Sequence, residues 1–254
     1  MRNKFKSVSK LGDLQEDGIF RFKPNQALIL DALLEKEPNI SFDTKFDEAR
    51  KQLSSFKGLK TLETPVGFVG ELRDYQKEAL SWAKFLNDFS LGGCLADDMG
   101  LGKTVVVLAI IQYMKNQNNS VKPSLVVVPK SLVFNWEEEC KKFTPTLKLL
   151  NYTGVQRDSL KESIANSDIV ITTYGTIRSE GEFFKDLDFR YIILDEAQAI
   201  KNSVTASFKA TRLLKGDHRL ALSGTPVENH LGELLSIFES VSYTHLTLPT
   251  SDLV

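Results

Sequence analysis

The segment CLADDMGLGKTVVV, which begins at Cys94, has the residue types of a phosphate-binding loop. The usual loop reads Gly, four residues, then Gly-Lys-Ser or Gly-Lys-Thr. Gly102, Lys103 and Thr104 are present here, but Asp97 stands where the first glycine belongs. Apolar residues lie before and after the loop, which is the strand–loop–helix order that phosphate binding requires. A helix that begins near Lys103 would direct its N-terminal N–H groups and its dipole toward the loop and favour an anion.

The residue types in this loop predict separate roles toward a nucleotide. Gly100 and Gly102 have no Cβ, so the backbone can approach a phosphate closely. Lys103 would reach the β- and γ-phosphates of ATP, and the Thr104 hydroxyl would hold Mg²⁺. The residues that we expect around the phosphates are Asp98, Met99, Gly100, Leu101, Gly102, Lys103 and Thr104.

Two adjacent carboxylates, Asp195 and Glu196, follow the apolar run YIIL. A P-loop enzyme needs an acidic residue at the end of a buried strand to hold the metal, and Asp195 fits that role. Glu196 would orient and deprotonate the attacking water as a general base. Like charges this close repel, and a magnesium ion relieves that cost. We therefore predict Glu196, Lys103 and Asp195 as catalytic residues, with Thr104 and Asp195 at the metal.

A third polar group, Ser223-Gly224-Thr225-Pro226, follows the apolar run in HRLAL. The hydroxyls of Ser223 and Thr225 could bond to the acidic motif and sense the γ-phosphate, which would couple this segment to hydrolysis. An ordinary turn is the simpler interpretation, because Ser, Gly and Pro are common turn residues.

Six apolar runs precede or carry these motifs, and helical stretches lie between them. The runs are GGCLA, SLVVVP, LKLLNY, DIVITTY, RYIILDE and HRLALSGT. Near-continuous apolar runs are typical of parallel strands buried on both faces. Between two of them, Leu132, Trp136, Cys140 and Phe143 share one face of a predicted helix. This alternation predicts an α/β fold with a mostly parallel, doubly wound sheet and helices on both faces, and ligands bind such sheets at the carboxyl ends of the strands.

The composition sets limits on the class of protein. The net charge of −1 provides no global basic field, so a contact with a polyanion would need a local patch. Cys94 and Cys140 form no CxxC pattern, which argues against a structural metal or a disulfide framework. The basic start MRNKFKSVSK is not followed by an apolar signal-peptide core, and the apolar run 105–111 is too short to span a membrane. We expect a cytoplasmic protein without a membrane contact.

Three regions differ in their sequence pattern. Residues 1–69 contain two stretches with helical spacing, NQALILDALLEKE and FDEARKQLSSF, and are predicted to be partly helical. Residues 70–241 carry the strand and helix alternation and form the predicted ATPase lobe. Residues 242–254 fit neither pattern, and we expect a non-native tail; a divergent native tail is the alternative.

The three motifs together resemble motifs I, II and III of superfamily-two helicases. DDMGLGKT, DEAQAIKN and SGTPVENHLGELLSIFE further resemble the Swi/Snf-related DNA-dependent ATPases of bacterial type, in which an acidic residue at the position of Asp97 is normal. ELRDYQKEALSWA resembles the adenine-side motif of that family, which implies that Gln76 contacts adenine. LVVVPKSLVFNWEEE resembles motif Ia, and ITTYGTI resembles the segment after it. The resemblance covers roughly residues 70–239, and the helices before it resemble the segment that precedes the ATPase core in bacterial members.

The resemblance implies a RecA-like lobe of a motor that hydrolyses ATP with Mg²⁺ and moves along double-stranded DNA, usually without separating the strands. It also implies a set of DNA contacts: Pro129, Lys130, Ser131, Thr172 and Thr173. Hydroxyls, backbone amides and one lysine suit phosphate contacts that do not read sequence. Simple loop capping is the alternative role for these residues.

The family's ATP site lies between two such lobes, and the second supplies an arginine finger. The sequence ends before a second lobe could begin, so we expect this chain alone to bind Mg-ATP weakly and to hydrolyse it slowly. Alternative functions remain. One is a strand-separating DNA or RNA helicase, although DEAQAIKN in place of Asp-Glu-Ala-Asp argues against RNA. Others are a non-motor nucleotide-binding or interaction fragment and, more remotely, a small-molecule P-loop kinase.

Overall fold

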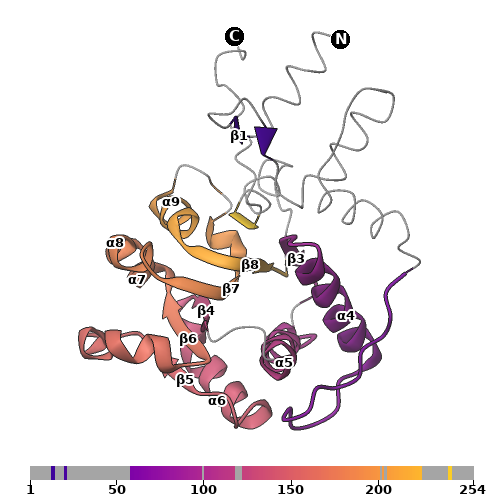
Figure 1. The fold of residues 1–254 in the computed structure, drawn as a ribbon. Helices are drawn as coiled ribbons and strands as arrows, with labels where there is room; N and C mark the ends of the chain where they lie inside the picture. The colour runs from indigo at the N-terminus through magenta and orange to yellow at the C-terminus, as the bar shows by residue number, and fades with distance from the viewer. Residues whose placement is uncertain are drawn as a thin grey trace, which may run out of the picture. The chain divides into compact units, whose positions relative to one another are not determined.

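The structure is a computed structural model of the 254-residue chain (Figure 1). The residues that it describes are 13–14, 20–21, 58–98, 100–117, 122–200, 202, 205–224 and 240–241. The chain forms two compact units: one contains residues 1–58, 88–90 and 244–254, and the other contains residues 59–87 and 91–243.

The first unit is described only at two short strands. β1 (Asp13–Leu14) and β2 (Phe20–Arg21) pair in antiparallel orientation. The two helices predicted within residues 1–69 lie outside the described residues, and so does the tail 242–254. Both remain predictions.

The second unit contains a six-stranded sheet in which every pairing is parallel. Its spatial order is β3-β8-β7-β4-β6-β5. The strands are β3 (Gly93–Leu95), β4 (Ser124–Val128), β5 (Leu149–Asn151), β6 (Ile169–Thr173), β7 (Asp188–Leu194) and β8 (Lys215–Leu222). Four of them lie within a predicted apolar run, and β7 and β8 overlap theirs but begin two and three residues earlier, so the predicted parallel α/β sheet is confirmed. All carboxyl ends therefore lie at one edge, which is the edge where ligands bind such sheets.

The central strand β4 shows why these runs are apolar throughout. Val126 and Val128 pack into a cluster on one face of the sheet, whereas Leu125 and Val127 pack into a second cluster on the other. All four side chains are fully buried. Because successive side chains of a strand point to opposite faces, a strand covered on both sides has no position for a polar residue.

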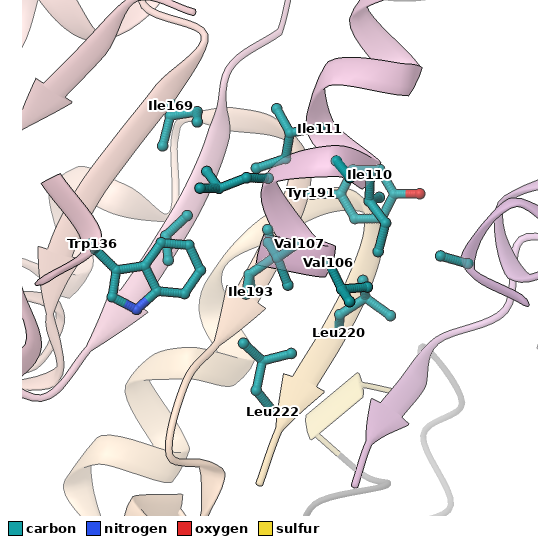
Figure 2. Close-up of a cluster of buried hydrophobic side chains, with 14 of the residues drawn as sticks. Val106, Val107, Ile110, Ile111, Trp136, Ile169, Tyr191, Ile193, Leu220 and Leu222 are labelled. Carbon is teal, nitrogen blue, oxygen red and sulfur yellow. The ribbon is translucent and has the colours of Figure 1, made fainter. Parts of the chain in front are cut away.

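The first face is covered by α4 (Asp74–Asp88), α5 (Lys103–Asn116) and α6 (Val133–Phe143). Figure 2 shows α5 residues packed against the strands in this cluster, with Trp136 of α6 at its other side. Residues 106–111 of α5 are all buried, so this helix is enclosed on nearly every side. Trp136 and Cys140 are buried as their predicted helical face requires.

The second face is covered by α7 (Tyr174–Ser179), α8 (Gly181–Phe184) and α9 (Ala206–Leu213), which Figure 1 shows on the side of the sheet away from α4 and α5. The described residues of the lobe also form three 3₁₀-helices: η2 (Lys130–Leu132), η3 (Arg157–Asn166) and η4 (Ala197–Ile200). Tyr152 and Phe184 pack edge-to-face with ring centroids 5.5 Å apart. This aromatic packing fixes α8 against the end of β5.

The segment that precedes α4 packs on the same lobe. The Phe68 ring stacks on Phe143 at 5.7 Å, and the Val69 amide donates to the Phe143 carbonyl at 2.8 Å. Further back, the Leu62 amide donates to the Ser81 hydroxyl of α4 at 2.8 Å. The compact unit thus includes residues from 59 onward, whereas the change in sequence pattern indicated a boundary at 70. An extended segment has no periodicity to reveal that it belongs to the lobe.

Candidate nucleotide and DNA site

The phosphate loop joins β3 to α5 and needs glycine at two positions. Gly100 and Gly102 have φ of +84° and +79°, a region that glycine occupies at little cost. A Cβ on Gly102 would also lie 2.9 Å from the side-chain nitrogen of Gln76. Asp97 is not among the positive-φ residues of the described chain, so its side chain causes no backbone strain. An aspartate is therefore compatible with the loop at the position where the usual pattern has glycine.

Lys103 lies at the start of α5 and contacts the loop before it. Its ammonium donates to the carbonyl of Asp97 at 2.8 Å and to that of Asp98 at 3.1 Å. The charge is thus held at the loop where a phosphate would lie. Thr104 follows on the first turn of α5 and is half-buried, and Met99 lies outside the described residues.

The N-terminal end of α4 contacts the same loop. The Tyr75 hydroxyl donates to the Leu101 carbonyl at 2.9 Å, and the side-chain amide of Gln76 donates to it at 3.4 Å. The Arg73 amide in turn donates to Gln76 Oε1 at 3.0 Å. The structure therefore brings Gln76 to the loop, and its contact with adenine stays a prediction.

Asp195 stands at the end of β7 and is only 6% exposed. Its backbone amide donates to the Val127 carbonyl at 2.9 Å, which fixes its place beside β4. Trp136 Nε1 donates to Oδ2 at 2.8 Å, and the Glu196 amide donates to Oδ1 at 2.9 Å. Burial raises the pKa of Asp195, and these two N–H donors and the Lys103 charge oppose that rise. Both carboxylate oxygens are therefore held by donors that favour the ionised form.

These residues fit a magnesium ion that arrives with a nucleotide. Among the described residues, no group of three or more His, Cys, Asp or Glu side chains could hold a metal. Mg²⁺ is usually bound by one or two carboxylates together with substrate phosphates and water. Asp195 supplies such a carboxylate and retains unused lone pairs on both oxygens. Its pKa responds to Lys103, so the acid and the loop act on one another electrostatically.

Glu196 has φ of +48°, a left-handed conformation that is uncommon for a residue with a side chain. Its carboxylate accepts a hydrogen bond from the side-chain amide of Gln198. The Ser223 hydroxyl donates to the other end of that amide, Gln198 Oε1, at 3.3 Å, and the Ser223 backbone amide donates to the Leu95 carbonyl at 3.2 Å. The structure thus places the Ser223 hydroxyl against Gln198 of the acidic motif, and its role in sensing the γ-phosphate stays a prediction. Thr225 lies outside the described residues.

A groove of about 510 Å³ opens at the carboxyl ends of β4, β5 and β6. Side chains and backbone from α6, α7 and the loop after β5 form its walls. The lining residues are Lys130, Val133, Phe134, Glu137, Thr153, Gly154, Arg157, Thr173, Gly175, Thr176 and Ser179. Two of the predicted DNA contacts, Lys130 and Thr173, thus lie in one groove.

The predicted DNA contacts differ in exposure. Lys130 and Ser131 are exposed, and Pro129 is half-buried. Thr173 caps α7, because its hydroxyl accepts the Thr176 amide at 3.2 Å. Thr172 does not fit the prediction: it is fully buried, and its hydroxyl donates to the Tyr152 carbonyl at 3.0 Å. Neighbouring residues of a strand point to opposite faces, so the two threonines cannot share one role.

The sequence did not point to the ion pair beside this groove. The Arg157 guanidinium donates to the Glu180 carboxylate, and Arg157 Nη1 also donates to the Gly154 carbonyl at 2.5 Å. The Tyr152 hydroxyl donates to the same carboxylate at 2.8 Å. These residues fix the loop after β5 against α7 and α8, and no local spacing could have paired them.

The sequence also missed three residues around the acidic motif. Trp136 was expected in a core face and in the block that resembles motif Ia, Gln198 in the segment DEAQAIKN, and Tyr174 at the end of a strand and in the segment that follows motif Ia, but none was predicted to contact the acidic motif. The Tyr174 hydroxyl donates to the Asp195 carbonyl at 2.8 Å. Its burial raises the pKa of Tyr174 well above the ordinary value, so the hydroxyl remains a donor.

A parallel sheet with a glycine loop at one strand end and a buried aspartate at another defines a P-loop ATPase lobe of RecA type. Comparison with known families narrows the class further: the chain belongs to the SNF2-related domain family, whose sequence model matches residues 75–248. That match extends past Val241 into the segment set apart as a tail. None of the described helices has the length and apolar character needed to cross a membrane.

The chain is similar to several longer proteins. It is 39% identical to the putative ATP-dependent helicase/translocase YwqA of Bacillus subtilis, over 77% of this chain and 22% of that protein. It is 34% identical to the human TATA-binding protein-associated factor 172, over 87% of this chain and 13% of that protein. The chain therefore spans about a fifth or less of the length of these relatives.

A solved structure agrees with the family assignment. The Sulfolobus solfataricus SWI2/SNF2 ATPase core in complex with double-stranded DNA matches with a TM-score of 0.67 and 40% identity. The match covers 72% of this chain and 38% of that one. Together with the resemblance of the motifs, this confirms the RecA-like fold class and the SNF2-type ATPase lobe.

Proposed function

We propose that this chain is the first ATPase lobe of an ATP-dependent translocase or remodeller that acts on double-stranded DNA. The observation that carries the proposal is Asp195: a buried carboxylate held by two N–H donors, under the electrostatic influence of the loop residue Lys103. The groove at the carboxyl ends of β4, β5 and β6 opens at the same edge of the sheet. The similarity to an ATPase core solved with double-stranded DNA supports the choice of polymer.

The nucleotide would bind on the loop between β3 and α5. Residues 98–104 would surround the phosphates, and Lys103 would exchange its bonds to the loop carbonyls for bonds to phosphate oxygens. Asp195 and Thr104 would hold Mg²⁺, which supplies charge stabilisation for the transferring phosphoryl group. Glu196 would accept a proton from the attacking water.

Duplex DNA would lie along the groove that Lys130 and Thr173 line. These residues offer a cation and a hydroxyl, which suit phosphate oxygens and carry no base-reading pattern. Pro129, Ser131 and the backbone around them would extend the contact. Binding would therefore depend on salt more than on sequence.

Efficient hydrolysis would need a second lobe. Lys103 places a cation at the loop, and its charge favours the ionised form of Asp195. A P-loop ATPase adds an arginine finger that stabilises the transition-state charge, and removing that cation costs about 10³- to 10⁵-fold in turnover. The finger would come from a second RecA-like lobe that packs over the loop.

The test is ATP hydrolysis with and without duplex DNA, measured on this chain and on a two-lobed protein that carries it as its first lobe. We expect slow turnover from the 254-residue chain and DNA-stimulated turnover from the two-lobed protein. Robust, DNA-stimulated turnover by the isolated chain would contradict the need for a second lobe. A two-lobed protein that ignores duplex DNA would contradict the motor function and favour a nucleotide-binding module.

A second assay separates translocation from strand separation. A translocating two-lobed protein displaces the third strand of a DNA triplex as it moves along the duplex. We expect ATP-dependent triplex displacement and no separation of a DNA or RNA duplex. Efficient unwinding of either duplex would favour a strand-separating helicase instead.

A further inference from the structure

Two elements that line the groove also reach the metal-binding acid. The chain runs from Lys130 in the groove through η2 directly into α6, and Trp136 of α6 donates to Asp195 Oδ2. It also runs from Thr173 in the groove directly into α7, whose first residue Tyr174 donates to the Asp195 carbonyl. Asp195 is thus held at its side chain from one groove wall and at its backbone from the other.

The bond from Trp136 is short and enclosed. The indole is 1% exposed, and its Nε1 lies 2.8 Å from Asp195 Oδ2. Figure 2 shows the ring among the apolar side chains of the first face, near Ile169. A buried indole N–H needs a hydrogen-bond partner, and an ionised acceptor makes such a bond stronger. Because the ring is packed on its faces, a shift of α6 moves the N–H with it.

The bond from Tyr174 has the same character on the other side. Its hydroxyl lies 2.8 Å from the Asp195 carbonyl, and the side chain is 8% exposed. The preceding residue, Thr173, caps α7 through the Thr176 amide, and Thr176 also lines the groove. A ligand that engages Thr173 or Thr176 therefore acts on the helix turn that carries Tyr174.

We infer that Trp136 and Tyr174 are positioning residues that transmit occupancy of the groove to Asp195. The inference rests on the proposed function, since the groove ligand is the DNA backbone. Hydrogen bonds weaken steeply as distance and angle depart from their optimum. A displacement of α6 and α7 by bound DNA changes how Asp195 is oriented toward Mg²⁺, and so changes hydrolysis without a contact between DNA and nucleotide.

A positioning role and a purely structural role of Trp136 and Tyr174 affect different measured quantities. A core residue that only fills space affects stability and leaves the Mg²⁺ and DNA dependence of turnover alone. Partners that orient a metal-binding carboxylate typically affect metal affinity or activity by about 10- to 100-fold. Trp136→Phe keeps an aromatic ring in the cluster and removes the N–H, and Tyr174→Phe removes only the hydroxyl.

The first experiment uses the two-lobed protein. For W136F we expect the Mg²⁺ concentration that gives half-maximal turnover to rise about 10-fold and the stimulation by duplex DNA to fall about 10-fold, with DNA affinity unchanged. Tyr174→Phe, which removes less of the core, should reduce the stimulation in the same direction. Trp82→Phe is the matched control, because Trp82 packs on the same cluster from α4.

The second experiment has a readout other than turnover. The chain contains two tryptophans, so the Trp82→Phe variant of the 254-residue chain leaves Trp136 as its one indole fluorophore. We expect duplex DNA alone, added without nucleotide, to change the Trp136 emission. A Lys130→Ala substitution should shift that change to higher DNA concentration, in parallel with DNA binding measured by anisotropy.

The outcomes separate the two proposals. Suppose that duplex DNA stimulates turnover of the parent protein, and that W136F and Y174F both keep this stimulation and the same Mg²⁺ dependence. This result overturns the inference that Trp136 and Tyr174 transmit groove occupancy to Asp195, and it leaves the motor function intact. The inference is also overturned if anisotropy shows DNA binding while the Trp136 emission does not change. If W136F does not fold, Y174F and the emission experiment decide. A parent protein that neither binds nor responds to duplex DNA overturns both the proposed function and the inference about Trp136 and Tyr174.

Discussion

The phosphate loop and the groove lie at the same edge of one sheet, yet they are built in different ways. The loop is one continuous segment between β3 and α5, and most of its contacts use backbone atoms: the carbonyls of Asp97 and Asp98 and the two left-handed glycines. The groove is assembled from the ends of three strands and the helices that follow them. Its shape depends on side chains that are distant in the sequence.

The energetic character of the two regions differs as well. Asp195 is buried and has a specific N–H donor for each carboxylate oxygen, so electrostatic effects on it are strong, whereas the loop beside it is partly exposed. The groove is open, and its Arg157–Glu180 ion pair is partly exposed, with side chains 26% and 15% accessible. Exposed charge pairs are screened and contribute little individually. A single substitution should therefore abolish the function of the loop and only weaken that of the groove.

The largest effect that we expect is from Glu196→Gln in the two-lobed protein. The amide keeps the size of the side chain but cannot accept a proton, and general-base catalysis contributes about 10²- to 10⁴-fold. ATP turnover should fall by that factor while the affinity for an ATP analogue stays within about twofold. Single-turnover hydrolysis and equilibrium binding measure the two quantities. Near-normal hydrolysis would remove Glu196 from the role of base.

Lys103→Ala should cost about 10²- to 10³-fold in turnover, because it removes a cation placed where charge develops on the phosphoryl group. It should also weaken nucleotide binding, which distinguishes it from the change at Glu196. The matched control is Lys115→Ala on the same helix, where the lysine pairs with Asp168 at 2.6 Å near the opposite edge of the sheet. If the two alanine variants behave alike, the loop is not the functional site.

The same contrast explains how far the sequence could predict the molecule. All six strands and the helical face of α6 followed from apolar patterns, because buried parallel strands leave a continuous signal. The loop followed from local spacing, since its function depends on neighbouring residues. Asp97 departs from the usual loop pattern, but the backbone at this position does not have a positive φ and therefore needs no glycine.

What the sequence could not predict are contacts that the sheet order creates. Trp136 reaches Asp195 because β4 and β7 are neighbours, although 59 residues separate them in the chain. Thr172 and Thr173 read as equivalent hydroxyls, yet the alternation of the strand buries one and leaves the other at the groove. Patterns in the sequence identify elements, whereas strand order and side-chain direction decide which residues meet.

At the groove, Lys130→Ala should weaken duplex binding by a small factor that is uniform across sequences. Losing one phosphate contact reduces the slope of log affinity against log salt by about 0.9. Titrations at several salt concentrations measure this, with Lys115→Ala as the charge-matched control away from the groove. An unchanged slope would mean that Lys130 does not contact the DNA backbone. A 100-fold loss of affinity would mean that the groove is as specific as the loop.

The smallest effect that we expect comes from Tyr152→Phe, at a buried residue directly before the groove-lining Thr153. Its hydroxyl donates to Glu180 at 2.8 Å, and the carboxylate keeps its bond to Arg157 when the hydroxyl is removed. A hydrogen bond of this kind contributes about 1 kcal/mol to stability. The free energy of unfolding in urea should fall by that amount, while nucleotide binding, which the separately built loop provides, does not change. Tyr113→Phe on α5 controls for loss of a tyrosine hydroxyl elsewhere in the lobe. If Tyr152→Phe instead impairs nucleotide binding, the loop depends for its structure on a side chain behind the groove, and the difference drawn between how the two regions are built is wrong.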